Sequence, residues 1–217
     1  MRLYGYWRSS AAYRVRIALN LKGVGYESVP VDLRAGGQRA PEFLAVNPQG
    51  IVPCLRDGEA TLTQSLAIIE YLEETRPEPP LLPADPVARA RVLAIALAVA
   101  CEMHPLNNLK VLQYLEREMG VDDEGRRRWY HHWIAEGFGP LERILSETAG
   151  TFAFGDRPTL ADVCLVPQVA NAHRYRCDMA PYPTIRRVNE RCLELPAFAA
   201  AAPERQPDAP PPRAPAG

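Results

Sequence analysis

The sequence has no long apolar run, only two lysines (Lys22 and Lys110) and no excess of charge of either sign. Residues 92–100 are all apolar, but this stretch is far shorter than the roughly 20 residues that a membrane helix needs. The formal net charge of −1 argues against bulk electrostatic attraction to nucleic acid or to an anionic membrane. The first residues, MRLYGYWRSS, lack the apolar segment of a signal peptide. We therefore expect a cytoplasmic protein that binds neither nucleic acid nor membrane.

Cysteine is present, but not in a pattern typical of disulfides or metal sites. The cysteines are odd in number, scattered and never spaced as CxxC: Cys54, Cys101, Cys164, Cys177 and Cys192. This pattern argues against a disulfide framework and against a zinc site. We expect most of these cysteines to be small core residues in a reducing compartment, and we predict no metal ion.

The first 80 residues alternate between strand-like and helical patterns. Runs of alternating polarity predict strands, and apolar residues at helical spacing predict helices. The expected order is strand, helix, strand, short helix, strand, strand and helix, over residues 2–6, 11–22, 26–31, 41–46, 52–55, 60–62 and 65–75. The Asp57-Gly58 turn signal joins the last two strands. This order predicts an α/β domain in which helices cover the faces of a small mixed sheet.

The remainder of the chain has a helical pattern. Residues 81–86 are rich in proline and predict a linker. Helical patterns follow over residues 87–120, 127–148, 159–174 and 182–193. Pro105 predicts a break in the first of these, and Thr159-Leu-Ala-Asp162 resembles a capping box at the start of the third. We therefore expect domains at residues 1–80 and 87–203, and a disordered tail at residues 204–217.

Three short motifs lie where predicted elements begin. Ser9-Ser10 precedes the first helix, whose unpaired N–H groups and dipole would stabilise a thiolate. Plain N-capping by one of these serines is the simpler explanation of the pair. Gln64-Ser65 opens a later helix, with Ser65 as a natural N-cap whose N–H could hold a carboxylate. At Val52-Pro53 a cis bond would expose the Val52 backbone to a peptide ligand, whereas a trans edge proline is commoner.

In this order, the motifs resemble the zeta class of the glutathione transferase superfamily. Residues 6–19, YWRSSAAYRVRIAL, are similar to the class signature S-S-C-x-x-R-V-R-I-A-L. Further similar blocks are NPQG at 47–50, VP at 52–53, QS at 64–65, HPLNN at 104–108, FGD at 154–156, PTLAD at 158–162 and PYP at 181–183. The resemblance covers residues 1–203. It implies a thioredoxin-like domain followed by an all-helical domain.

The resemblance also implies that this protein uses glutathione as its cofactor. Ser9 would donate a hydrogen bond to the glutathione thiolate, with Ser10 as the second candidate. Other parts of glutathione would contact the Val52 backbone beside a cis Pro53, Gln64 and Ser65 at the γ-glutamyl end, Gln38 at the glycyl end, and His104 and Asn108 in the cleft. A structural role at the helix break is the alternative for His104.

Members of this class act on substrates with two carboxylates. Arginine matches a carboxylate with two parallel hydrogen bonds, so we expect Arg8 and Arg176 to bind the substrate, with Lys110 as a third candidate. We expect Arg14 and Arg16 to pack on a helix face, or to form an ion pair with the other domain or subunit. Ala11 departs from the class signature, which has cysteine there; its methyl group leaves the substrate side more apolar.

The activity that the resemblance implies is a glutathione-dependent cis–trans isomerisation in aromatic amino-acid catabolism, by a homodimer. The expected reaction converts maleylacetoacetate to fumarylacetoacetate, or maleylpyruvate to fumarylpyruvate. A general glutathione transferase, acting on small electrophiles or haloacids, is the first alternative. A non-catalytic glutathione-binding module on the same fold is the second, because a fold alone does not determine function.

Overall fold

The computed structural model describes residues 1–211, and the chain divides into two compact units. Within the described residues, 1–80 and 194–211 form the first unit, and Leu81–Leu193 form the second. The division at residue 80 lies where the sequence placed it. The second boundary differs from the predicted one, because residues 194–203 belong with the N-terminal unit and not with the helical one. The part of the predicted tail at residues 212–217 lies outside the described residues.

A four-stranded sheet forms the centre of the first unit. Its order is β2 (Glu27–Pro30), β1 (Arg2–Gly5), β3 (Cys54–Asp57) and β4 (Ala60–Thr63), with β1 parallel to β2 and antiparallel to β3. Leu3 pairs with Ser28 on one side and with Leu55 on the other. This is the predicted mixed sheet of a thioredoxin-like domain, and the predicted strands are confirmed with ends shifted by one or two residues.

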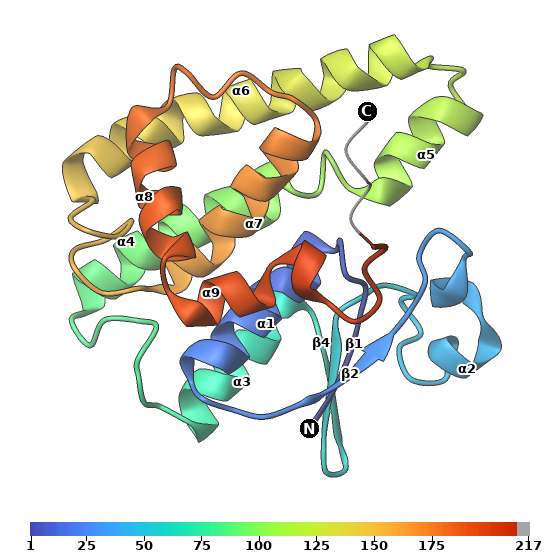
Figure 1. The fold of residues 1–217 in the computed structure, drawn as a ribbon, viewed down its shortest axis with the longest axis horizontal. Helices are drawn as coiled ribbons and strands as arrows, with labels where there is room; N and C mark the ends of the chain where they lie inside the picture. Colours follow the sequence, from blue (N-terminus) through green and yellow to red (C-terminus); the bar gives the residue numbers. More distant parts are fainter. Residues whose placement is uncertain (212–217) are drawn as a thin grey trace. The chain divides into compact units, whose positions relative to one another are not determined.

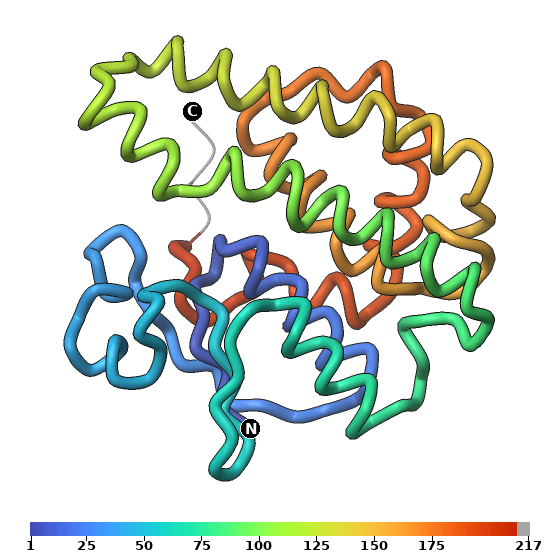
Figure 2. Tube along the Cα trace, turned by 180° about the vertical axis from the view of Figure 1, so that it is seen from behind, coloured from blue at the N-terminus to red at the C-terminus, as the bar shows by residue number. Residues whose placement is uncertain are grey.

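Helices cover both faces of this sheet, as Figures 1 and 2 show. The helices α1 (Ser10–Leu21) and α3 (Ser65–Thr75) lie on one side, and the short α2 (Pro41–Leu44) lies on the other, after η1 (Gly37–Arg39). Because neighbouring strand residues face opposite ways, Leu3 is buried on one face while Tyr4 packs against Phe43 of α2 on the other. Leu3 is thus buried, whereas Tyr4 on the opposite face is half-buried.

The late helix α9 (Pro196–Ala201) packs against α1, which accounts for the shifted boundary. Three polar side chains of α1 donate hydrogen bonds to backbone carbonyls of α9. The Tyr13 hydroxyl donates to Phe198 O (3.4 Å), Asn20 Nδ2 to Ala197 O (2.9 Å) and Arg16 Nε to Ala201 O (2.9 Å). As a result α1 is covered on nearly every side, with every residue from Ser10 to Leu19 buried.

The second unit is built from helices. Its elements are α4 (Pro86–Leu97), the π-helical segment η2 (Ala98–Met103), α5 (Leu109–Arg117), α6 (Asp123–Thr148), α7 (Leu160–Arg174) and α8 (Pro183–Leu193). The predicted break at Pro105 is confirmed, since the helical path ends before it and α5 starts at Leu109. Leu81 and Leu82 of the predicted linker are buried, and Leu81 O accepts from Leu160 N at 2.8 Å. None of the helices within residues 1–211 is long and apolar enough to cross a membrane.

The start of α7 is fixed by the predicted capping residues. Asp162 Oδ2 accepts from Thr159 N (2.8 Å), and Asp162 Oδ1 accepts from Ala153 N (2.7 Å). Burial raises the pKa of Asp162, while these N–H donors act in the opposite direction. The carboxylate thus joins the preceding loop to the first turn of the helix.

The helix α6 approaches η2 closely at Gly137. A Cβ atom at this position would overlap Met103, which is itself buried, whereas a Cβ atom at Gly139 would meet nothing within 4 Å. Gly137→Ala is expected to lower the free energy of unfolding by about 1–3 kcal/mol through overpacking. Gly139→Ala in the same helix is expected to change it by less than about 1 kcal/mol, because the better helix propensity of alanine is offset by crowding against Pro140. Chemical denaturation of both variants tests this, and equal effects would contradict it.

Candidate functional site

The turn between β1 and α1 carries Ser9 at the start of the helix. Ser9 N donates to Tyr6 O (2.9 Å), which closes a tight turn, and Ser9 has the extended backbone of an N-cap. Its Oγ accepts from Ala12 N at 3.2 Å, so Ser9 does cap the helix. Because an accepting hydroxyl keeps its own hydrogen, the half-buried Ser9 can still donate to a ligand. Ser10 is the first residue of α1 and only 8% exposed, so it is less accessible to a ligand than Ser9.

The start of α3 differs from the prediction. Gln64, not Ser65, is the N-cap residue, and Gln64 has a φ of 68°, in the left-handed region that few non-glycine residues adopt. The Gln64 side chain donates to Gln49 Oε1 (3.1 Å). Ser65 is the first residue inside the helix, and its Oγ accepts from Arg14 Nη1 at 3.3 Å. The unpaired N–H groups of this first turn are the kind of donors that hold a carboxylate.

Three further predicted residues of the first unit lie just before a strand or in a short helix. The Val52–Pro53 peptide bond is cis, and both residues precede β3, whose ladder begins at Cys54. Gln38 lies in η1, and its buried Oε1 has no hydrogen-bond partner among residues 1–211. A buried amide oxygen without a partner is costly, so a donor from a ligand would be favourable here. The orphaned oxygen fits an N–H group of a peptide ligand, and the first turn of α3 fits one of its carboxylates.

In the second unit, three predicted residues lie close together in sequence before and within α5. His104 caps the end of η2, and its N–H donates to Val99 O at 3.0 Å. Asn108 is the N-cap of α5, with Oδ1 accepting from Lys110 N at 3.1 Å. The Lys110 side chain is exposed. Asn108 therefore has a structural role in addition to any that it has in binding.

Arg176 lies just after α7 and is held in a left-handed conformation, with a φ of 57°. Its N–H donates to His173 O at 3.0 Å, and its side chain is exposed. The preceding Tyr175 is firmly fixed, because its ring stacks on Tyr130 with centroids 3.6 Å apart and its carbonyl lies 2.8 Å from His131 Nε2. The structure thus presents this arginine from a well-anchored backbone.

Comparison with known proteins places the chain in a family. Residues 3–80 match the glutathione S-transferase N-terminal domain, and residues 124–200 match the glutathione S-transferase C-terminal domain. A probable maleylacetoacetate isomerase of Vibrio cholerae is 57% identical over 95% of this chain and 97% of its own. This chain belongs to the zeta class of the glutathione S-transferase family.

Two solved structures of relatives are very similar to this zeta-class chain. The holo structure of a bacterial maleylpyruvate isomerase, described as a zeta-class glutathione S-transferase, has a TM-score of 0.95 and 48% identity, over 97% of this chain and 100% of the other. A maleylacetoacetate isomerase of Methylobacterium extorquens, with bound malonate and glutathione, has a TM-score of 0.94 and 48% identity over the same shares. The predicted fold class and family are confirmed.

Arg14 and Arg16 of the zeta-class signature are both buried within the first unit. The Arg16 guanidinium lies over the Tyr13 ring of the same helix, which fits the predicted packing on a helix face. Arg14 reaches Ser65 within the same unit, and Arg16 donates to the carbonyls of Ala201 and Trp7. Ala11, where the signature has cysteine, is buried in the first turn of α1.

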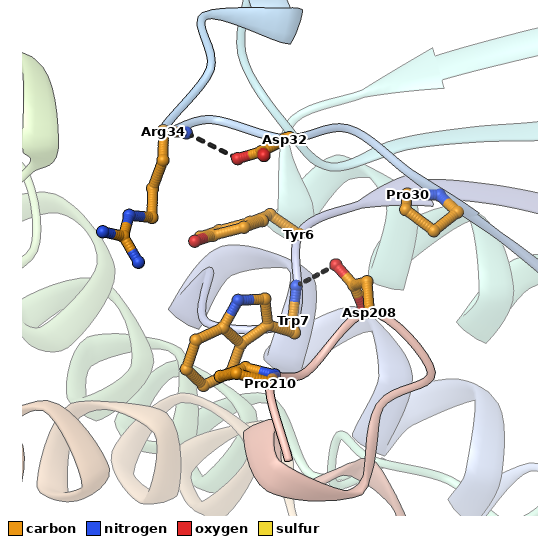
Figure 3. A pocket seen from close by; sticks show the side chains of 7 residues that line it. All are labelled: Tyr6, Trp7, Pro30, Asp32, Arg34, Asp208 and Pro210. Atoms are coloured by element: carbon orange, nitrogen blue, oxygen red, sulfur yellow. Dashed lines mark hydrogen bonds between the residues drawn. The ribbon is translucent and has the colours of Figure 1, made fainter.

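A pocket of about 240 Å³ lies beside the β1–α1 turn, within the first unit of this glutathione S-transferase fold. Figure 3 shows its lining: Tyr6, Trp7, Pro30, Asp32, Arg34, Asp208 and Pro210. None of these residues was predicted as part of a site, and two of them belong to the segment that was expected to be disordered. Within residues 1–211, no group of three or more histidine, cysteine, aspartate or glutamate side chains is arranged to hold a metal ion.

Proposed function

We propose that this protein is a glutathione-dependent cis–trans isomerase that converts maleylacetoacetate to fumarylacetoacetate. The relatives named above are isomerases of maleylacetoacetate and maleylpyruvate, and they match nearly the full chain. The observation that carries the proposal is the placement of Ser9, whose accessible hydroxyl caps the N-terminus of α1. Maleylpyruvate is the second substrate that we propose to test.

When bound, glutathione supplies a thiol that adds reversibly to the cis double bond, so that the bond can rotate before the thiol leaves. Ser9 holds the sulfur as a thiolate by donating a hydrogen bond to it, and the dipole of α1 favours the same negative charge. Ser10 is the second candidate for this role. Both effects lower the pKa of the thiol and thereby raise the fraction of the reactive form.

The remaining residues hold the two ligands in our proposal. The backbone of Val52, beside Pro53, pairs with the cysteinyl part of glutathione. Gln64 and Ser65 bind the carboxylate at the γ-glutamyl end of glutathione, and Gln38 binds the carboxylate at its glycyl end. His104 and Asn108 line the glutathione site from the second unit, and Arg8, Lys110 and Arg176 bind the substrate carboxylates. Arg8 already lies 5.6 Å from the centre of the Trp7 ring, which gives its guanidinium a preferred position.

Freshly generated maleylacetoacetate and maleylpyruvate, each with and without a catalytic amount of glutathione, provide the test. We expect cis-to-trans conversion that requires glutathione while the total glutathione remains constant, and the relative rates identify the substrate. Consumption of glutathione with small electrophiles or haloacids, without isomerisation, would instead indicate a general transferase. Binding of glutathione without any turnover would indicate a non-catalytic module.

Two replacements of Arg176 separate the loss of its guanidinium from the strain of its left-handed backbone. Arg176→Ala and Arg176→Gly both remove the guanidinium, so each is expected to lower kcat/KM about 10- to 100-fold, as the loss of a charge-assisted hydrogen bond does. Only glycine relieves the positive φ, so Arg176→Gly is expected to be about 1 kcal/mol more stable than Arg176→Ala. Arg91→Ala, at an exposed arginine of α4, is the control. Unchanged kinetics in both Arg176 variants would remove this residue from the proposed site.

We further propose that the protein works in the cytoplasm as a homodimer. All five cysteines, which lie within the described residues, are free thiols, as is usual in a reducing compartment. Val87 and Leu97 of α4 and Tyr114 of α5 are large apolar side chains that remain exposed in the single chain. Exposed apolar side chains of this size are common at subunit interfaces. Light scattering in solution measures the mass and tests the dimer directly.

A further inference from the structure

The backbone of Trp7 is held on both sides by groups distant in sequence. Its N–H donates to Asp208 Oδ2 at 2.9 Å, across a separation of 201 residues, as the dashed line in Figure 3 shows. Its C=O accepts from Arg16 Nη2 at 3.0 Å. Trp7 is the second residue of the Tyr6–Ser9 turn, so these contacts act two residues before Ser9.

These two contacts fix the direction of the chain as it enters the turn. The N–H of Trp7 belongs to the peptide plane shared with Tyr6, and its C=O belongs to the plane shared with Arg8. Each peptide plane is rigid, so orienting both planes fixes the two backbone dihedral angles of Trp7. The positions of Arg8 and Ser9 then follow with little remaining freedom.

The segment that carries Asp208 is itself anchored. Arg16 Nε donates to Ala201 O at 2.9 Å, and the Gln206 side chain donates to Ala200 O (3.0 Å) and Ala202 O (2.9 Å). A short helical turn, η3 (Pro203–Arg205), and a bond from Ala209 N to Gln206 O (3.0 Å) complete the path. Asp208 is therefore presented by a folded segment, which Arg16 holds at Ala201 and Gln206 holds at Ala200 and Ala202.

Arg16 also links the two contacts electrostatically. Burial lowers the pKa of Arg16 to about 10, and the charge of Asp208 is among the groups that act in the opposite direction. The guanidinium remains protonated at neutral pH. Arg16 and Asp208 carry opposite charges and both bond to the Trp7 backbone. The three residues thus form one connected network.

We propose that Asp208 is a positioning residue, whose carboxylate holds the Trp7 N–H and thereby sets the place of the Ser9 hydroxyl at the glutathione thiolate. This inference rests on the proposed function of Ser9 and adds a C-terminal residue to the machinery of the same site. The contact matters because a displacement of about 1 Å at a catalytic group can lower a rate about 100-fold. Asp208 itself does not touch the reacting atoms.

The test compares Asp208→Ala and Asp208→Asn with wild type and with Glu204→Ala. Glu204 is an exposed carboxylate of the same segment, so its removal controls for charge and for general effects on the C-terminus. The readouts are the ultraviolet absorbance of the bound glutathione thiolate as a function of pH, together with kcat, KM and thermal stability. We expect Asp208→Ala to raise the pKa of the bound thiol and to lower kcat about 10-fold, with little change in KM for glutathione.

Asp208→Asn keeps an oxygen that can accept from Trp7 N. We therefore expect its kcat and the pKa of its bound thiol to be close to the wild-type values. Glu204→Ala is expected to behave as wild type. A wild type that forms no bound thiolate would contradict the proposed function itself. A wild type that forms the thiolate, with Asp208→Ala equal to it in pKa and kcat, would overturn only the role of Asp208. Equal losses in the alanine and asparagine variants would also overturn it, because the hydrogen bond would then not be the cause.

Discussion

Replacement of Ser9 by alanine is expected to lower kcat about 100-fold or more and to raise the pKa of bound glutathione. Removal of one preorganised donor from a developing anion costs about 10²- to 10³-fold in other enzymes, because the donor acts in a partly water-excluded site. Ser9 is half-buried, and its Oγ is already fixed by the bond from Ala12 N. The measurements are steady-state isomerisation and a thiolate titration by ultraviolet absorbance.

Ser9→Ala also removes a helix cap, and this second effect requires its own control. Loss of an N-cap costs about 1 kcal/mol of stability. Asp85 caps α4 in the same way, with Oδ1 accepting from Ala88 N at 2.8 Å, so Asp85→Ala gives the cost of a lost cap alone. We expect similar stability losses in the two variants but loss of activity only in Ser9→Ala. If Ser10→Ala abolishes the thiolate and Ser9→Ala does not, the roles of the two serines must be exchanged.

Most elements of both units could be predicted because their signals are local, but the short helices η1, α9 and η3 were not predicted. Apolar periodicity, the Asp57-Gly58 turn and the Thr159–Asp162 capping residues each lie within a few positions of the structure that they specify. The start of α3 was misjudged by one residue, because serine is a much better N-cap than glutamine. The positive φ of Gln64 and the bond from Arg14 to Ser65 are tertiary effects that a local pattern does not contain.

The C-terminal part of the candidate site could not be predicted, for a related reason. Residues 203–211 are rich in proline and polar residues, and such a composition is typical of disordered segments. The contact that orders them is long-range: Asp208 bonds to Trp7, near the other end of the chain. Similarly, α9 belongs to the first unit only because side chains of α1, such as Arg16 and Asn20, bond to it and to the residue at its end.

The scarcity of lysine points to the residue with the largest expected effect on stability. Lys22 is one of only two lysines, and its side chain is completely buried at the end of α1. Its ammonium group forms an ion pair with Glu73 of α3 and donates to Arg76 O (2.8 Å) and Pro79 O (3.1 Å). An ammonium group has three N–H donors, which these three acceptors match. This residue therefore joins α1 to the end of α3 and to the last residues before the second unit.

Glu73→Gln is expected to lower the free energy of unfolding by about 3–5 kcal/mol, because it leaves a buried cation without a counter-charge. Glu27→Gln is the matched control: Glu27 pairs with Arg2 at 2.8 Å, but both side chains are more than half exposed, so about 1 kcal/mol or less is expected. Chemical denaturation of the two variants measures the difference. A small effect at Glu73 would show that water or a local rearrangement solvates Lys22 when its partner is removed.

A double replacement distinguishes the ion pair from ordinary packing at this position. In wild type, Lys22→Met removes the cation that pairs with the buried Glu73 carboxylate, and it also removes the donor to Arg76 O and Pro79 O. In the Glu73→Gln background, Lys22→Met removes a cation that already lacks its counter-charge. The loss in free energy of unfolding is therefore expected to be smaller there by about 1–3 kcal/mol. Strict additivity of the two single effects would contradict the ion pair as the cause. In that case, each replacement would lower the stability through contacts that do not involve the other residue, because only independent effects add.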